Sequence, residues 1–485
     1  MYVVKKNNNG QWIVIKKGAK RASKAFDSKA EAIMYAKNKY PNNYEVENEI
    51  EINDRTYKVK TSGKKKSKAF IILFSLVMLA IIIVGILWWF DYIKIPGLDK
   101  IKDEDPINDS NSNNQNNHID GVVYDDFQIH FLELGNEYTG DSTYIKAGDV
   151  DILIDAGSRK NSAVAIKEYV DKYCTDGKLE YVIATHAHQD HIAGFVGSKD
   201  GSTRTGIFYQ YEIGVLIDFA LTDVTSQLYT NDYVAGVEYL VNNGTKHYQA
   251  DDCWNEENGA KRQYAITDNV TMDILYNKYY FEEASDENDY SVCTLFTYTE
   301  GSNEHRFMMT GDLEQEGEEA LADYYKKNGG LGHCDLFKAG HHGSVSSTND
   351  CLLELITPDV CTVCCCAGST EYTEDYNNVF PTQAFINRIA KYTDAVYVTT
   401  VFDEKEKTFK SFNGTIVVSC KGEDLAVACS NNNTKLKDSE WFNQTIYYVL
   451  DDDGDPLIAP KGTENFYTSE SAGAKSAPRR VWPSA

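Results

Sequence analysis

A dense run of potential metal ligands lies near the middle of the chain. Residues 185–191 read Thr-His-Ala-His-Gln-Asp-His and follow the short apolar segment 182–184. Three histidines and one aspartate within six residues are too dense for a chance cluster in a chain that has only ten histidines. Imidazole and carboxylate groups suit zinc, and also manganese or iron. The run therefore predicts metal chemistry at the end of a strand, carried by His186, His188, Asp190 and His191.

Four ligands from one loop rarely close a catalytic metal centre, so we expect further ligands at later strand ends. The apolar run 307–310 ends in a glycine and Asp312, whose carboxylate could bridge two metal ions. A second apolar run, 336–339, leads through a glycine to His341 and His342. The residues alone leave open which of these two histidines completes the second metal site.

Together with Asp155 in the segment Leu-Ile-Asp-Ala-Gly, this set of residues resembles the metallo-β-lactamase fold. More narrowly, the chain is similar to the hydrolase-like domain of the competence DNA-uptake (ComEC) group. The resemblance implies an α/β (α+β) fold, an αββα sandwich that holds metal ions at one edge of two packed sheets. The segments that support it follow the family order: 131–145, 288–292, 338–344, 377–381 and 414–416.

The resemblance assigns the ligands of two divalent metal ions, most often zinc, with manganese or iron as alternatives. His186 and His188 would hold the first metal, and Asp190 and His191 the second. Asp312 would bridge the two ions. His341 would be the later ligand of the second metal, because family members place this histidine directly after a strand and a glycine.

The resemblance also implies roles around the ligands. His342 would either support the ligands from behind or face the substrate, and it is expected to act in catalysis together with Asp190 and Asp312. Asp155 would brace the histidine loop from behind the metals. Asp141 is a weaker candidate for such a supporting role, near the mouth of the site.

The chain departs from the family pattern in the first metal site. Many family members supply a third histidine there, and this chain offers only His247, in a polar loop, and His305, which we expect to be exposed beside a hairpin turn. Phe380 stands where relatives often carry a histidine, and Asn136 replaces part of another family segment. The first site could therefore be less fully occupied than the second.

Composition and hydropathy divide the chain into parts with different environments. Residues 1–68 hold 17 Lys and Arg against 7 Asp and Glu, a net charge of +10, so the remainder of a chain with net charge −25 carries −35. The uncharged segment 69–90 is long enough to cross a bilayer as a helix, follows four lysines, and ends near Trp88 and Trp89. The positive-inside rule predicts that the N-terminus lies in the cytoplasm and the acidic body outside the cell.

We expect five parts along the chain. The first resembles a small uncharacterised bacterial domain family, with strand-like runs around residues 2–4 and 12–15 and a helix over 29–39. In the body, strands are expected at 129–134, 150–155, 181–185 and 306–310, and helices at 163–172 and 316–327. The parts are a cytoplasmic α+β module (1–62), a transmembrane helix (69–90), a linker (91–123), the metal-binding domain (124–420) and a C-terminal extension (421–485).

Four of the eleven cysteines crowd one apolar segment, residues 361–366. They could form a metal or redox cluster, but no matching Cys-x-x-Cys pair occurs elsewhere. A buried strand that uses cysteine as a small hydrophobic residue is the favoured interpretation.

Together these features predict a membrane-anchored, extracytoplasmic dinuclear-metal hydrolase. The resemblance points to phosphodiester substrates, either nucleic acid or a phosphorylated cell-surface polymer, attacked by a hydroxide that bridges the metals. The net charge of −35 on the body argues against broad nucleic-acid binding. Two alternatives remain open: hydrolysis of a lactam, thioester or other carboxyl derivative, and a non-catalytic metal-binding sensor or scaffold.

Overall fold

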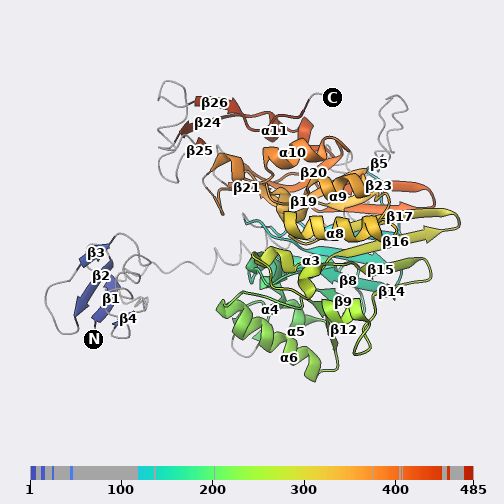
Figure 1. The fold of residues 1–485 in the computed structure, drawn as a ribbon, viewed down its shortest axis with the longest axis horizontal. Coiled ribbons are helices and arrows are strands. Elements are labelled where there is room, and N and C mark those ends of the chain that lie inside the picture. The colour runs from blue at the N-terminus through green and yellow to red at the C-terminus, as the bar shows by residue number, and fades with distance from the viewer. Residues whose placement is uncertain are drawn as a thin grey trace, which may run out of the picture. The chain divides into compact units, whose positions relative to one another are not determined.

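The chain forms two compact units, Met1–Asn111 and Ser112–Ala485, in this computed structural model (Figure 1). Each unit is described by itself. The described residues are 2–6, 12–16, 24–26, 44–46, 118–135, 138–200, 203–373, 375–403, 406, 408–450, 456–458 and 475–483.

The described part of the first unit is a small four-stranded sheet in the order β3-β2-β1-β4. Its two predicted strand-like runs are confirmed, because β1 and β2 pair antiparallel with Val4 opposite the buried Val14. The expected helix at 29–39, membrane helix at 69–90 and most of the linker lie outside the described residues. Within the described residues no helix is both long and apolar enough to span a bilayer. The strands are β1 (Tyr2–Lys6), β2 (Trp12–Lys16), β3 (Lys24–Phe26) and β4 (Tyr44–Val46).

A nine-stranded mixed sheet begins the second unit, in the order β13-β12-β9-β8-β7-β6-β22-β23-β5. Strands β8, β9, β12 and β13 run parallel to one another, so their carboxyl ends meet at one edge. The strands are β5 (Ile119–Asp120), β6 (Phe127–Phe131), β7 (Thr143–Ala147), β8 (Val150–Ile154), β9 (Lys178–Ile183), β12 (Glu212–Asp218), β13 (Lys246–Gln249), β22 (Ile416–Lys421) and β23 (Asp424–Cys429).

The second sheet of this unit has eight strands, in the order β14-β15-β16-β17-β18-β19-β20-β21. Its centre, from β17 to β20, is parallel and brings the ends of β17 and β18 side by side. The strands are β14 (Gln263–Ala265), β15 (Val270–Ile274), β16 (Thr294–Glu300), β17 (Asn303–Met309), β18 (Leu336–Lys338), β19 (Val360–Ala367), β20 (Val396–Asp403) and β21 (Thr408–Ser411).

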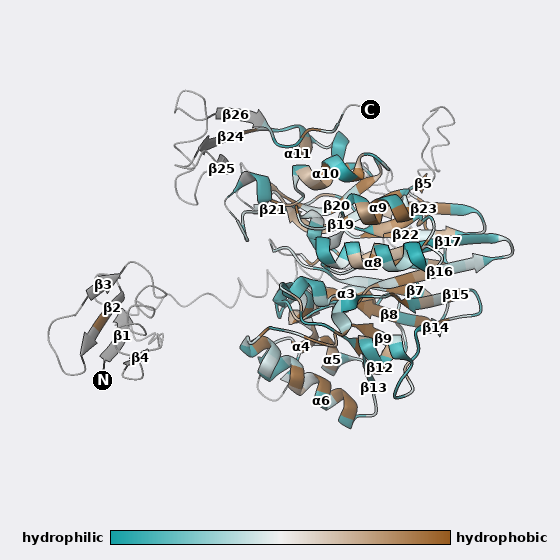
Figure 2. Ribbon diagram, viewed as in Figure 1, coloured by the Kyte–Doolittle hydropathy of each residue, from teal (hydrophilic) through white to brown (hydrophobic). Residues whose placement is uncertain are grey.

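The two sheets pack face to face with helices outside them, as the αββα expectation requires (Figure 1). Phe127 on β6 lies with its ring centroid 5.3 Å from that of Phe307 on β17, inside one core that draws on both sheets. The outer helix α8 carries many hydrophilic residues (Figure 2). The helices are α3 (Ser162–Val170), α4 (Gln189–Val196), α5 (Ile207–Gln210), α6 (Val234–Asn242), α7 (Ala250–Asn255), α8 (Gln315–Lys327), α9 (Asp350–Ile356), α10 (Gln383–Ile389) and α11 (Glu440–Asn443).

The boundary expected at residue 420 falls inside the hairpin of β22 and β23, and β23 continues the nine-stranded sheet. Trp441 and Phe442 of α11 are buried in the core beneath the eight-stranded sheet. Residues beyond 420 therefore belong to the same unit, which also includes the small sheet of β24 (Thr445–Leu450), β25 (Pro456–Ile458) and β26 (Lys475–Pro478).

The cysteine-rich segment forms β19, and all eight of its residues are buried. All eleven cysteines of the chain are free thiols. This confirms the interpretation of the segment as a buried strand that uses cysteine as a hydrophobic residue.

One close approach fixes helix α4 against the end of β8. The backbone N–H of Gly194 donates to the carbonyl oxygen of Ala156 at 3.0 Å, and a Cβ atom on Gly194 would lie 2.0 Å from that oxygen. A side chain there must push the helix away from the sheet. Replacing Gly194 by alanine should therefore lower the free energy of unfolding of the metal-free protein by about 1–3 kcal/mol.

Urea unfolding monitored by circular dichroism measures this difference. Val164 on the neighbouring helix α3 is 48% exposed, so Val164→Ala is a matched control that should change stability by no more than about 0.5 kcal/mol. Equal stability of Gly194→Ala and the wild type would show that the close approach is not needed.

Candidate metal centre

The histidine run spans a strand end, a loop and the first turn of a helix. Strand β9 ends at Ile183 and α4 begins at Gln189, so His186 and His188 lie in the loop and Asp190 and His191 in the helix. His186 and His191 are fully buried, with ring centroids 4.2 Å apart. The run therefore gathers its imidazoles at the carboxyl edge of the nine-stranded sheet.

Asp155 holds this loop in place from the neighbouring strand β8. Its carboxylate accepts hydrogen bonds from the backbone N–H of Thr185 at 2.8 Å, from the hydroxyl of Thr185 at 2.8 Å and from Nδ1 of His191 at 2.7 Å. Because Nδ1 of His191 carries the donated proton, Nε2 keeps its lone pair for a metal ion. Asp155 thus lies where the sequence places a supporting residue.

Asp312 approaches His191 from the eight-stranded sheet. It follows β17 through Gly311, whose φ of +55° favours glycine and whose added Cβ would lie 2.8 Å from Ser291 Oγ. The backbone N–H of Asp312 donates to Ser291 Oγ at 3.0 Å. Its Oδ2 atom then lies 3.1 Å from Nε2 of His191.

His342 arrives from the turn after β18, Gly340–Gly343. Its Nδ1 atom donates to the carbonyl oxygen of Cys364 at 2.9 Å. Its Nε2 atom lies 3.2 Å from Oδ2 of Asp190 and 3.2 Å from Oδ2 of Asp312. As in His191, the hydrogen bond at Nδ1 directs the lone pair of Nε2 toward the carboxylates.

Four side chains therefore converge on one point. The ligand atoms of Asp190, His191, Asp312 and His342 all lie within 4.8 Å of one another. Oδ1, the second carboxylate oxygen of Asp312, is buried and has no hydrogen-bond partner in the described part of the chain. Two imidazole nitrogens, two carboxylates and an unsatisfied buried oxygen fit a divalent cation.

The two histidines of the Gly340–Gly343 turn take opposite places from those expected. His341 is partly exposed, and its Nδ1 atom lies 3.0 Å from Oε1 of Glu314 instead of joining the converging group. Both histidines have positive φ values, 43° and 53°, which turn His342 inward and leave His341 at the surface of the site. The geometry favours His342 as the ligand and His341 as the residue that faces the substrate.

Two histidines and an amide lie together where the sequence places the first metal ion. Nε2 of His186 lies 3.0 Å from Nδ1 of His188, and Oδ1 of Asn288 lies 2.8 Å from the same Nδ1 atom. Nδ2 of Asn288 donates to Glu314 at 3.1 Å, which fixes the amide oxygen toward the histidines. Sequence reasoning missed Asn288 as a site residue, although it begins one of the segments that carry the family resemblance.

Neither of the other histidines considered from the sequence reaches this site. Nε2 of His247 bonds to Asp218 at 2.8 Å. Nδ1 of His305 bonds to Asp335 at 2.8 Å, and the side chain is buried, not exposed as expected. Both histidines serve structural ion pairs.

Asp141 is buried beneath the metal ligands, not at the mouth of the site as expected. It forms an ion pair with the buried amine of Lys338, and its Oδ1 atom lies 3.3 Å from Nδ1 of His342. Burial alone would raise the pKa of Asp141, but the charges of Lys338 and His342 outweigh burial and lower it. Lys338 was also missed, although a lysine inside an apolar strand is the signal that could have found it.

The carboxylates of the centre are held ionised, ready for a cation. Burial would raise the pKa of Asp312, yet His191 and His342 keep that pKa well below its usual value. In turn, burial would lower the pKa of His191, but Asp312 and Asp155 hold it well above the usual value. Metal ions would take the place of the protons on these histidines and supply the positive charge of the site.

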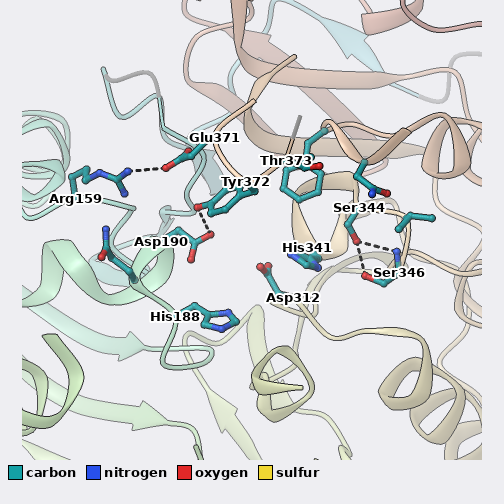
Figure 3. A pocket seen from close by; sticks show the side chains of 14 residues that line it. Arg159, His188, Asp190, Asp312, His341, Ser344, Ser346, Glu371, Tyr372 and Thr373 are labelled. Carbon is teal, nitrogen blue, oxygen red and sulfur yellow. Dashed lines mark hydrogen bonds and ion pairs between the residues drawn. The ribbon is translucent and has the colours of Figure 1, made fainter. Parts of the chain in front are cut away.

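A cavity of about 710 Å³ opens over the centre, and Figure 3 shows the Asp312 carboxylate between His188, Asp190 and His341. The ring of Phe380 closes one side, with its centroid 5.5 Å from that of His341. The other lining residues are Arg159, Gln189, Ser344, Val345, Ser346, Glu371, Tyr372, Thr373 and Asn378.

Two family models match parts of the chain. One, described as the metallo-beta-lactamase superfamily, matches residues 135–201, which include the whole histidine run. The other, an uncharacterized protein conserved in bacteria (DUF2188), matches residues 1–59. A comparison with curated proteins finds no match to the sequence.

Solved structures give distant likenesses. A mutant of the β-hydroxylase CmlA is 9% identical with a TM-score of 0.32, and the match covers 57% of this chain and 53% of that one, about half its length. A probable metal-dependent hydrolase from Staphylococcus aureus is 12% identical with a TM-score of 0.23, covering 39% and 74%. BJP-1, a subclass B3 metallo-β-lactamase of Bradyrhizobium japonicum, is 14% identical with a TM-score of 0.24, covering 44% and 77%.

The metallo-beta-lactamase superfamily model matches the segment that carries the histidine run. The two packed sheets are compatible with that fold, and the group of Asp190, His191, Asp312 and His342 could hold a metal ion.

The ligand assignment predicts different effects for the two adjacent histidines. His342→Ala should lower the bound metal from about two ions to about one per chain, because it removes a ligand from the converging group. His341→Ala is the matched control and should keep both ions. Metal content after dialysis, measured by inductively coupled plasma mass spectrometry, distinguishes them, and loss in His341→Ala alone would reverse the assignment.

Proposed function

We propose that this protein is a dinuclear-metal hydrolase of phosphodiester bonds. The observation that carries the proposal is the position of Asp312, which joins the converging group through Oδ2 and keeps a buried, unpartnered Oδ1 atom. A carboxylate that offers one oxygen to a group of ligands and keeps its second oxygen free is suited to bridge two cations.

The residues divide between the two ions as follows. Asp190, His191 and His342 would hold the second ion, and Asp312 would contribute to both. His186 and His188 would hold the first ion, with the amide oxygen of Asn288 in the place of a third histidine. When bound, two such cations lower the pKa of a water molecule and stabilise the negative charge that develops on the attacked group.

Phosphodiester substrates are favoured by the resemblance to the ComEC group and by hydrogen-bond donors among the residues that line the cavity. His341 and Ser344 line the cavity and can donate to anionic oxygens. The net charge of −35 beyond residue 68 argues against broad nucleic-acid binding, so a defined stretch of nucleic acid or a phosphorylated cell-surface polymer is the proposed substrate class.

Hydrolysis of bis(4-nitrophenyl) phosphate tests the activity directly. The metal-loaded wild type should release 4-nitrophenolate, and removal of metal with a chelator should abolish turnover. His188→Ala and Asp312→Asn should each reduce kcat/KM by more than about 100-fold, since a direct ligand matters more than the residues behind it. His333→Ala is the control, because His333 is half-exposed and pairs with Asp359 away from the centre.

The same assay separates the alternatives. Turnover of nitrocefin or a thioester without phosphodiester turnover would replace the proposal by a hydrolase of carboxyl derivatives. Full metal occupancy without turnover of any of these substrates would favour a metal-binding sensor or scaffold.

We also propose that segment 69–90 anchors the chain in the membrane, with the hydrolase unit outside the cell. An externally added protease on intact cells should then digest the unit that begins at residue 112 and spare residues 1–62. Lysed cells serve as the control in which both parts are digested. Protection of the hydrolase unit in intact cells would contradict this orientation.

A further inference from the structure

Tyr372 reaches over the candidate metal centre from the loop that follows β19. Its hydroxyl donates to Oδ2 of Asp190 at 3.1 Å, and the side chain lines the cavity (Figure 3). Asp190 Oδ2 is also within 3.2 Å of Nε2 of His342, inside the converging group. The phenol is therefore a hydrogen-bond donor held beside the oxygen that a cation would bind.

The loop that carries Tyr372 is fixed to the nine-stranded sheet by the preceding residue. The carboxylate of Glu371 accepts from Arg159 Nη2 at 2.7 Å and from the backbone N–H of Thr139 at 2.9 Å. The Arg159 guanidinium lies 3.5 Å from the centroid of the Tyr138 ring. These contacts hold the loop, and with it Tyr372, in position over the centre, although 53% of the surface of Tyr372 is exposed.

On the other side, the ring of Tyr372 has its centroid 6.1 Å from that of Phe380. Phe380 in turn packs against both histidines of the Gly340–Gly343 turn. Tyr372 is thus held by the contacts of Glu371 on one side and by Phe380 on the other. Its hydroxyl, and not its ring, contacts the carboxylate of Asp190.

Several other donors of the cavity are tied to acceptors away from the centre. Arg159 pairs with Glu371, and the Ser346 hydroxyl donates to Glu314 at 2.8 Å. Nδ2 of Asn378 donates to Asp375 at 3.0 Å. Tyr372, by contrast, donates to a metal ligand, and a cation on Asp190 Oδ2 withdraws electron density and weakens that oxygen as an acceptor.

We propose that Tyr372 is a substrate-contacting residue whose hydroxyl donates a hydrogen bond to an anionic oxygen of the phosphoryl group bound over the two metals. This rests on the proposed function and adds a residue that the metal assignment does not include. The phenol keeps its proton, so Tyr372 contributes binding and charge stabilisation without a proton transfer.

The test compares Tyr372→Phe with Tyr372→Ala. If the hydroxyl matters, both variants should lose about 10-fold or more in kcat/KM for bis(4-nitrophenyl) phosphate. Tyr372→Phe should then be no more active than Tyr372→Ala. If only the ring matters, Tyr372→Phe should match the wild type, which would overturn the proposal. Tyr239→Phe on α6, a 42% exposed tyrosine away from the cavity, is the control.

A second readout does not depend on turnover. The cobalt-loaded protein is titrated with inorganic phosphate while its visible absorption is recorded. Tyr372→Phe should leave the cobalt stoichiometry and the phosphate-free spectrum unchanged but weaken phosphate binding by about 10-fold. Equal phosphate affinity in the variant and the wild type, or no phosphate binding to the wild type, would overturn the proposal. A wild type that binds phosphate but hydrolyses no phosphodiester would defeat the proposed function while leaving the role of Tyr372 to be judged by this titration.

Discussion

The centre depends on two hydrogen bonds that occupy the Nδ1 atoms of its buried histidines. Nδ1 of His191 donates to Asp155 at 2.7 Å, and Nδ1 of His342 donates to the carbonyl oxygen of Cys364 at 2.9 Å. Each bond fixes the tautomer that leaves Nε2 as a ligand and turns the ring toward Asp312. Ion pairs between these rings and the carboxylates of Asp190 and Asp312 then complete the group.

The same constraint explains why the fold needs two sheets. Asp155 and His191 come from the nine-stranded sheet, while Asp312 and His342 come from ends of the eight-stranded one. The centre forms only where the two edges meet. Asp155 and His342 have positive φ values, 58° and 53°, a backbone strain that recurs at functional sites in proteins.

The sequence predicted the parts of this arrangement that follow from spacing along one chain segment. The expected strand at 150–155 and helix at 316–327 match β8 and α8 within a residue, because their hydrophobic periodicity is local. The histidine run and Asp312 are recognisable because histidine and aspartate are common metal ligands and follow apolar strands.

The parts that depend on backbone geometry or on contacts between sheets could not be read in this way. Two adjacent histidines look alike in sequence, and only their φ values decide which one turns inward. Asn288 and Lys338 carry no metal-ligand signal, since an amide and an amine acquire their roles from distant partners. The burial of Asp141 under His342 depends on how the two sheets pack. The sequence could not predict it, and Asp141 was expected at the mouth of the site instead.

A crystal structure of the zinc-loaded protein, with anomalous data at the zinc edge, tests the central claim most directly. The account predicts an ion bound to Nε2 of His191, Nε2 of His342 and the carboxylates of Asp190 and Asp312, at about 2.0–2.2 Å from each. An ion bound to His341 in place of His342, or no anomalous peak among these four side chains, would contradict it.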